Sequence, residues 1–301
     1  MTKLIIQPHG RLNDWVADEK GYFTEEGLEY ELNVEGSRKN TPRLAGLELD
    51  APLKDDRFGA FERYGEGHGR KGEGGGDVSC ACHWTVNQAA KIDGGIMWMK
   101  AYSVCEAAIV VPPESPVSEP SQLAGVGIAV GYHSGSHYSA LQAVEVFLPP
   151  DQINLQFVGS SWSRVDAAVA RKIPAVNVWG PQLYLLEQHG FRRTVSTTFM
   201  MAFMFPPDVE AERVERYMRA LIRAQSDIDL EPERYKHYFL NEIPERFRDA
   251  VDVRRFGVGE RVVPLPYTPA MFDKTQAWMH ARKLFDDAPG NQTSREHPIR
   301  S

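Results

Sequence analysis

A short loop of hydroxyl, glycine and imidazole groups precedes a predicted helix and could bind a charged ligand. The loop consists of His133, Ser134, Gly135, Ser136 and His137. The N-terminus of a helix presents unpaired N–H groups and a partial positive charge, while the serines add hydroxyl donors and the glycine lets a ligand approach the backbone. The pattern therefore predicts a site for a carboxylate, sulfonate or phosphate. The alternative is an ordinary serine N-cap between two surface histidines.

Cysteine and histidine side chains gather in a second segment, between a predicted strand and a predicted helix. Cys80 and Cys82 alternate along an extended chain and so share one face, and His83 follows them. One functional interpretation is an enzyme in which Cys82 is a thiolate nucleophile with His83 as its partner. Another is a pair of soft metal ligands, but the spacing is not that of a zinc site. No metal or other cofactor is therefore predicted, metal binding stays open, and the remaining interpretation is two buried thiols.

Further candidate residues stand at the ends of predicted strands. His9 follows the first strand, Tyr102 ends a later one, and Trp179 and Gly180 end another. Aromatic side chains commonly form the walls of sites for planar ligands. Together with Cys80 and the loop 133–137, these residues complete the predicted ligand-binding set.

Alternating strands and helices must position these residues. Residues 4–32 read as a β-α-β unit, which predicts a parallel sheet. Later strands are predicted over 78–82, 96–102, 107–111, 126–130, 155–158, 175–178 and 194–198, with helices between most of them and a mainly helical C-terminal third. The glycine-rich tract 65–76 is predicted as a partly mobile loop that could cover a cleft, because glycine loses most entropy on ordering.

Composition restricts the possible partners. The 301 residues carry a formal net charge of −7 and no long basic run, which argues against nucleic acid. No stretch of about 20 apolar residues occurs, so membrane insertion is not expected. The first residues show no apolar leader, and three cysteines leave one without a disulfide partner. Both observations favour a cytoplasmic protein, with a periplasmic location as the alternative if a leader has been removed.

Three segments together resemble a known family. They are residues 21–28 (GYFTEEGL), 131–138 (GYHSGSHY) and 175–181 (AVNVWGP). They resemble, in order and spacing, the substrate-binding proteins of sulfonate, taurine and nitrate ABC transporters and the related NMT1/THI5-like proteins. This resemblance implies a two-lobed α/β fold of the type II periplasmic-binding-protein class, with a ligand cleft between the lobes. Lobe one would comprise residues 1–105 and 200–301, and lobe two residues 106–199.

The resemblance also carries expectations about function. It implies a solute-binding protein for a small anionic or heteroaromatic organic molecule, with a transporter permease as its partner if the protein is exported. The same fold includes desulfinases and decarboxylases, so the alternative is a cytoplasmic lyase or decarboxylase that acts on an aromatic acid through Cys82 and His83. A third reading is a cytoplasmic sensor. This sequence departs from the family pattern at Pro174, where the family usually has an acidic residue.

Overall fold

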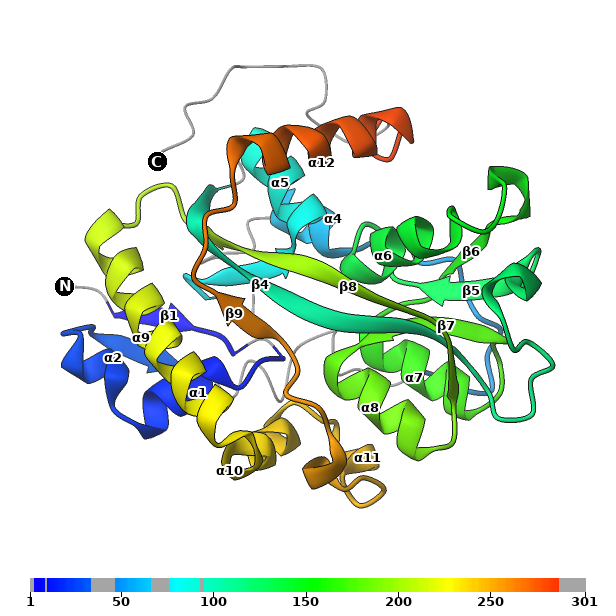
Figure 1. The fold of residues 1–301 in the computed structure, drawn as a ribbon, viewed down its shortest axis with the longest axis horizontal. Helices are drawn as coiled ribbons and strands as arrows, with labels where there is room; N and C mark the ends of the chain where they lie inside the picture. The colour runs from blue at the N-terminus through cyan, green and yellow to red at the C-terminus, as the bar shows by residue number, and fades with distance from the viewer. Residues whose placement is uncertain (1–2, 9, 34–46, 66–75, 93–94, 287–301) are drawn as a thin grey trace.

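The computed structural model describes residues 3–8, 10–33, 47–65, 76–92 and 95–286, which form a mixed α/β fold (Figure 1). Two sequence predictions fall outside these ranges: the ligand role of His9 and the mobility of most of the glycine-rich tract.

The described elements follow the order β-α-β, then alternating strands and helices, then helices. The strands are β1 (Leu4–Ile6), β2 (Tyr30–Leu32), β3 (Ser79–Cys82), β4 (Ile96–Val111), β5 (Gly127–Val130), β6 (Asn154–Phe157), β7 (Ala175–Trp179), β8 (Arg192–Phe205) and β9 (Arg261–Val263). The α-helices are α1 (Asn13–Glu19), α2 (Tyr22–Glu25), α4 (Ala60–Gly65), α5 (His83–Lys91), α6 (Gly135–Val144), α7 (Ser161–Val169), α8 (Gly180–Gln188), α9 (Ala211–Leu230), α10 (Pro232–Tyr235), α11 (Glu245–Arg248) and α12 (Pro269–Ala281). Short 3-10 helices are η1 (Pro120–Leu123), η2 (Pro150–Gln152), η3 (Lys236–Asn241) and η4 (Val253–Arg255).

The strands of the described residues form a small sheet and a large one. The small sheet pairs β1 with β2 in parallel, as the N-terminal β-α-β pattern predicts. The large sheet has the order β3-β8-β4-β7-β5-β6, and β9 adds to β4. Within it β5 is parallel to β6 and β7, whereas β4 is antiparallel to its neighbours. The parallel part brings the carboxyl ends of β5, β6 and β7 to one edge, where a ligand site is expected.

Two long strands, β4 and β8, lie next to each other within the large sheet. The sequence predicted separate strands over 96–102 and 107–111, but β4 is continuous across both, with a register irregularity against β8. Lys100 and Glu106 do not break the strand, because alternation places Lys100 at an exposed position and Glu106 at a half-buried one. The lobe boundaries predicted at 105 and 199 fall inside these two strands, and that division of the chain stays a prediction.

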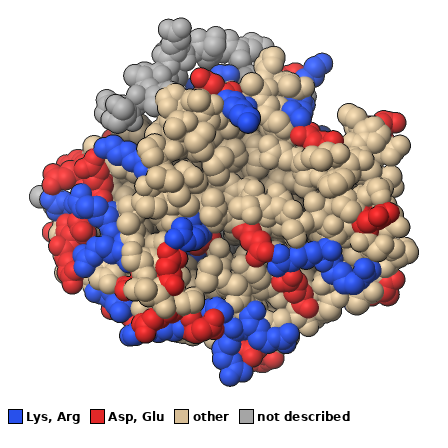
Figure 2. All heavy atoms as spheres, viewed as in Figure 1, with Lys and Arg blue, Asp and Glu red and all other residues tan. Residues whose placement is uncertain are grey.

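Helices cover both sides of the long strands. Figure 1 shows α5, α6 and α12 on one side of β4 and β8, and α7 and α8 on the other. One buried cluster includes the faces of α9, α5 and β8, and a smaller one lies between β5, α6 and the end of β4. Over the face in Figure 2, acidic and basic side chains are interspersed rather than gathered into one basic patch.

Residues 47–58, here called the crossing segment, connect distant parts of the fold. The Leu47 N–H donates to Asp166 of α7 at 3.0 Å, and the Asp56 N–H donates to the Phe157 carbonyl of β6 at 3.0 Å. The chain then enters α4, which packs against α5. The crossing segment therefore lies against elements of the predicted second lobe, although the sequence analysis grouped it with the first.

Candidate functional site

A pocket opens where β5, β6 and β7 end and α6, α7 and α8 begin. Its cavity volume is about 160 Å³. It is lined by Phe58, Gly59, Ala60, Ala81, Cys82, Gly131, Tyr132, Ser134, Gly135, Gly159, Ser160, Ser161, Arg164, Trp179, Phe199 and Met201. The first N–H groups of α6 and α7 have no partners within their helices, as at any helix start. The first residues of both helices, Gly135 and Ser161, line the pocket, so the positive ends of the two helix dipoles lie beside it.

Arg164 places a cation at this pocket. It lies in the first turns of α7 and is only 3% exposed. Its Nη1 donates to the carbonyls of Val158 and Gly159, at 3.2 and 2.8 Å, but among the described residues its Nε has no hydrogen-bond partner and no carboxylate forms an ion pair with it. Burial lowers the pKa of Arg164 to about 10, opposed only by the charge of Asp56. A buried charge without an ion-pair partner is costly, so an anion bound beside Arg164 would be stabilised.

Hydroxyl groups stand beside this guanidinium. Ser160 is the N-cap of α7 and accepts a hydrogen bond from the Ser163 N–H at 3.1 Å. Ser134 precedes α6, and its hydroxyl donates to the Gly131 carbonyl at 2.6 Å. A Cβ atom on Gly131 would lie 2.8 Å from Nη1 of Arg164 and 2.9 Å from Oγ of Ser134, so glycine leaves the space in which these two groups meet.

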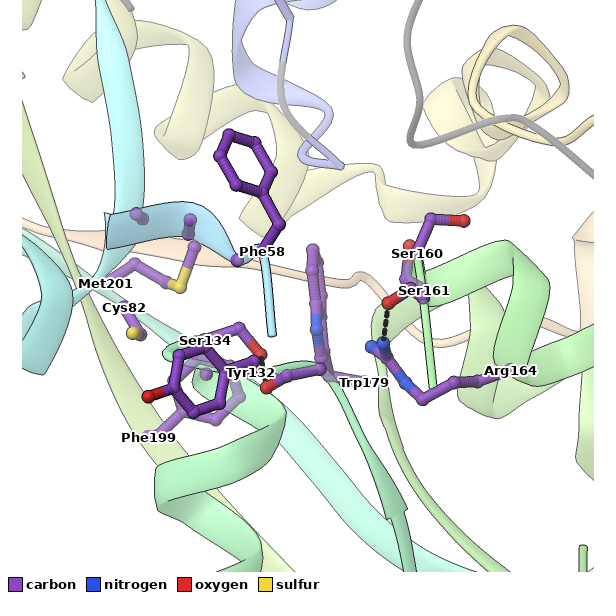
Figure 3. A pocket seen from close by; sticks show the side chains of 16 residues that line it. Phe58, Cys82, Tyr132, Ser134, Ser160, Ser161, Arg164, Trp179, Phe199 and Met201 are labelled. Atoms are coloured by element: carbon purple, nitrogen blue, oxygen red, sulfur yellow. Dashed lines mark hydrogen bonds between the residues drawn. The ribbon is translucent and has the colours of Figure 1, made fainter. Parts of the chain in front are cut away.

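The other end of the pocket is apolar and aromatic. Figure 3 shows Phe58, Tyr132, Phe199 and Met201 on one side of the pocket, Arg164 with Ser160 and Ser161 on the opposite side, and Trp179 between them. The rings of Trp179 and Phe199 meet edge to face, with centroids 6.4 Å apart. Phe58 remains 43% exposed. The pocket thus has one end suited to a negative charge and one suited to an apolar group.

The structure brings four of the predicted site residues into this pocket: Cys82, Ser134, Gly135 and Trp179. Gly180, the first residue of α8, follows Trp179 with a φ of 53° but does not itself line the cavity.

The other members of the loop 133–137 are buried beside the pocket instead of lining it. The Ser136 hydroxyl accepts the Gly131 N–H at 2.9 Å and so holds the loop in shape. His133 and His137 are 4% and 6% exposed, which contradicts the alternative of two surface histidines. Burial lowers the pKa of His137 to about 3, so it is neutral at physiological pH.

Cys80 and Tyr102 lie away from the pocket. Cys80 is buried, its thiol donates to Glu260 at 3.5 Å, and burial raises its pKa. Tyr102 is half-buried and pairs with Val263 of β9. Cys80 lies in β3 and Tyr102 in β4, and neither residue lines the pocket.

Cys82 and His83 do not meet as a nucleophile and its base. The Cys82 thiol donates to Oγ1 of Thr85 at 3.1 Å, and burial raises its pKa to about 11. Nδ1 of His83 lies 2.8 Å from the hydroxyl of Tyr267, and burial lowers the pKa of His83 to about 3. The thiol is therefore protonated near neutral pH, and the imidazole is engaged by the segment before α12.

Sequence reasoning missed Arg164, Ser160 and Ser161, together with the aromatic residues of the opposite end. A signal existed, because Val158-Gly159-Ser160-Ser161 repeats the strand–glycine–serine–helix order of the loop after β5. The arginine itself carried no signal, since an arginine in a helix is usually solvated.

The described residues contain no group of three or more histidine, cysteine or acidic side chains placed to hold a metal ion. Of the helices that the structure describes, none has both the length and the apolar character that a bilayer crossing requires.

Comparison with solved structures establishes the fold. No protein-family model matches the sequence, and no curated protein does. The periplasmic aliphatic sulphonate-binding protein SsuA from Escherichia coli superposes with a TM-score of 0.63 at 14% identity, over 98% of this chain and 92% of that one. The chain has the type II periplasmic-binding-protein fold.

Two further structures of this fold are informative. The alkanesulfonate-binding protein SsuA from Xanthomonas axonopodis pv. citri, bound to MOPS, matches with a TM-score of 0.61 at 16% identity, over 94% of each chain. The desulfurization enzyme DSZB matches with a TM-score of 0.56 at 12% identity, over 94% of this chain and 93% of that one. The fold therefore includes both binding proteins and an enzyme.

Proposed function

We propose that this chain is a solute-binding protein that holds a small organic anion in the pocket between α6, α7 and α8. The observation that carries the proposal is Arg164, a buried guanidinium that reaches the pocket and lacks a carboxylate partner among the described residues. Binding of an anion would give this charge its counter-ion, and the hydroxyls of Ser160 and Ser161 would complete the coordination. The sulfonate ligands named for the two SsuA proteins are of this kind.

The two ends of the pocket define the ligand further. A sulfonate, sulfinate or carboxylate group would meet Arg164, and an apolar body would contact Trp179, Phe199 and Met201. The cavity volume of about 160 Å³ is close to the roughly 150 Å³ that accommodates a benzene ring in a protein interior. We therefore propose monocyclic aromatic or short aliphatic anions as the ligand class.

Titration calorimetry tests the proposal with benzenesulfonate, benzoate, ethanesulfonate and MOPS, and with benzyl alcohol as an uncharged analogue. We expect 1:1 binding of at least one anion and much weaker binding of the alcohol. Arg164→Gln should weaken anion binding by about 1.5–3 kcal/mol, roughly ten- to 150-fold in Kd, as expected when a hydrogen bond to a charged group is lost.

Arg171→Gln is the matched control, because Arg171 follows the same helix but pairs at the surface with Glu114. It should bind as the parent does. Equal affinity for benzenesulfonate and benzyl alcohol, or undiminished anion affinity in Arg164→Gln, would contradict the proposal that Arg164 binds the anion.

A transporter permease as partner and a cytoplasmic or periplasmic location belong to the same proposal. We propose a cytoplasmic location, with the periplasm, where the SsuA protein from Escherichia coli is found, as the alternative. Cell fractionation with an antibody against the protein distinguishes the two, and co-purification of membrane components from the periplasmic fraction tests the permease.

A lyase or decarboxylase acting on an aromatic acid is the second candidate, because the Cys82 thiol lines the pocket and DSZB shares the fold. The raised pKa of Cys82 and the turned-away His83 favour binding over nucleophilic catalysis. Incubation with aromatic sulfinates and carboxylates, followed by chromatography, tests the enzyme directly. Product formation that Cys82→Ser abolishes, with ligand affinity retained, would favour this candidate instead.

A further inference from the structure

His133 is buried behind the pocket with both ring nitrogens against oxygen atoms. Nδ1 is paired with Oε1 of Glu62 from α4. Nε2 lies 2.7 Å from the carbonyl oxygen of Leu284, in the segment after α12. A carbonyl oxygen can only accept a hydrogen bond, and so can an ionised carboxylate. A neutral imidazole has one N–H and satisfies one of these acceptors, whereas the imidazolium satisfies both.

Glu62 is held in its ionised form by donors on both oxygens. Its Oε2 accepts the Gly59 N–H at 2.9 Å, while Oε1 receives the hydrogen bond from His133. Burial by itself would raise the pKa of Glu62, but the hydrogen bond and the charge of His133 outweigh burial, and the pKa is lowered. Two acceptors, one of them an ionised carboxylate, therefore face the two ring nitrogens of His133.

This ion pair joins two walls of the pocket. Phe58, Gly59 and Ala60 form one wall, and the neighbours of His133 in sequence, Tyr132 and Ser134, form the adjoining one. The two walls are in close contact, since a Cβ atom on Gly59 would lie only 1.6 Å from the carbonyl oxygen of Tyr132. Loss of a proton from His133 would remove the ion pair with Glu62 and would leave one of the two acceptors, Glu62 or the Leu284 carbonyl, without a donor.

We infer that His133 is a positioning residue whose imidazolium fastens Glu62, and with it the wall of residues 58–60, to the ligand loop, so that anion affinity falls when His133 loses its proton. The inference rests on the proposed function, because it assumes that the pocket binds an organic anion. His133 itself does not line the pocket, so it acts through the arrangement of its neighbours.

Among the described residues, the other titratable or charged groups around His133 come from α4, the crossing segment, the ligand loop and α6. They are Glu62 from α4, Tyr132 from the loop, His137 and Tyr138 from α6, and Arg57, which lies over the Tyr132 ring. His137 is neutral because burial lowers its pKa to about 3, and burial raises the pKa of Tyr138. An imidazole ordinarily titrates near pH 6.5, so binding is compared between about pH 5.5 and about pH 8.5.

Linkage between proton binding and anion binding gives the direction of the pH dependence. The bound arrangement favours the protonated imidazole, so binding takes up protons and affinity is highest at low pH. With benzenesulfonate as the probe, calorimetry should show Kd about tenfold higher at about pH 8.5 than at about pH 5.5. Repeating the titration near pH 7 in two buffers of different ionisation enthalpy should reveal proton uptake.

His133→Asn removes the titrating group and keeps a residue that tolerates the φ of 40° found here. Its affinity should be independent of pH, close to that of the parent at high pH, and without proton uptake. His237→Asn is the control, because His237 is exposed and bonds only its own helical turn, through the Arg234 carbonyl. It should keep both the pH dependence and the uptake.

Glu62→Gln separates fastening from simple attraction between the imidazolium and the anion. Fastening predicts weaker binding at low pH and a smaller pH dependence, whereas simple attraction predicts equal or tighter binding once a negative charge is removed. Equal or tighter binding by Glu62→Gln, or a pH dependence that persists in His133→Asn, overturns the inference.

A ligand-free measurement keeps the inference testable if benzenesulfonate does not bind. Amide exchange at residues 58–62 and 131–135, corrected for the intrinsic rate, should speed up several-fold in the parent between about pH 5.5 and about pH 8.5. In His133→Asn it should be equally fast at both. Unchanged protection in the parent overturns the inference, while absence of binding with this exchange pattern would count against the proposed function alone.

Discussion

The chain buries two arginines in opposite ways. Arg11, between β1 and α1, is completely buried and forms ion pairs with Asp14 at 2.9 Å and Glu260 at 3.4 Å. Its Nη2 also donates to the Tyr217 hydroxyl at 2.9 Å, which in turn donates to Asp14 at 2.7 Å. Arg164 is buried nearly as deeply but finds only backbone carbonyls among the described residues.

The difference separates a structural charge from a charge available to a ligand. A buried guanidinium with two carboxylates is neutralised within the protein and ties together the segments that supply them. A buried guanidinium without a carboxylate is held in place by the rest of the fold, and it becomes favourable when an anion arrives. The two arginines should therefore respond in opposite directions to the same substitution.

Arg11→Gln should show the largest effect. It would leave Asp14 and Glu260 buried without their counter-ion, so we expect a loss of about 3–5 kcal/mol in the free energy of unfolding. Urea denaturation measures it, and Arg261→Gln, which breaks the exposed pair with Asp229, should cost less than about 1 kcal/mol. Equal losses in the two variants would mean that the Arg11 cluster contributes no more than a surface pair.

Arg164→Gln should weaken benzenesulfonate binding by about 1.5–3 kcal/mol but leave the unfolding free energy of the unliganded protein unchanged or higher. The reason is that the variant removes a buried charge that has no described carboxylate partner. Calorimetry and urea denaturation on one preparation test both parts. A stability loss as large as that of Arg11→Gln would show that the two arginines have the same structural role.

Buried histidines extend the comparison, because an imidazole can lose its charge where a guanidinium cannot. Burial lowers the pKa of His83 to about 3, so its native state excludes a proton that the unfolded chain binds below about pH 6.5. This contribution to stability is complete above pH ~6.5 and is lost as the pH falls towards 3, with a slope of about 1.4 kcal/mol per pH unit. His83→Gln should reduce the measured slope between about pH 4 and 6 by about that amount, and an unchanged slope would place the acid sensitivity elsewhere.

Ser160→Ala should show the smallest effect. It removes the side-chain cap of α7 and one hydroxyl beside Arg164, so we expect a loss of about 1 kcal/mol in stability and a smaller loss of affinity than for Arg164→Gln. Ser121→Ala is a control, because the exposed Ser121 hydroxyl bonds only to the Glu119 carboxylate. A Ser160 variant as stable as this control would mean that the cap contributes little.

Local patterns predicted the N-terminal β-α-β unit and part of the pocket, whereas the fold class was predicted from the resemblance of three short segments to a known family. The pocket residues Cys82, Ser134, Gly135 and Trp179 stand at strand ends or helix starts, which short-range patterns mark. The extent of β4 was not predicted, because the continuity of the strand across 96–111 depends on its pairing with the distant strand β8.

The sequence by itself determined where loops, helix starts and small residues occur, since these depend on neighbours within a few positions. Tertiary structure alone decided which side chains are buried and therefore desolvated. Arg164 is buried because α7 packs where β6 ends, and His133 became half of an ion pair because α4 supplies Glu62 from 71 positions away. Charge and protonation depend on such distant partners through desolvation and Coulomb interaction, and no pattern within a single segment records them.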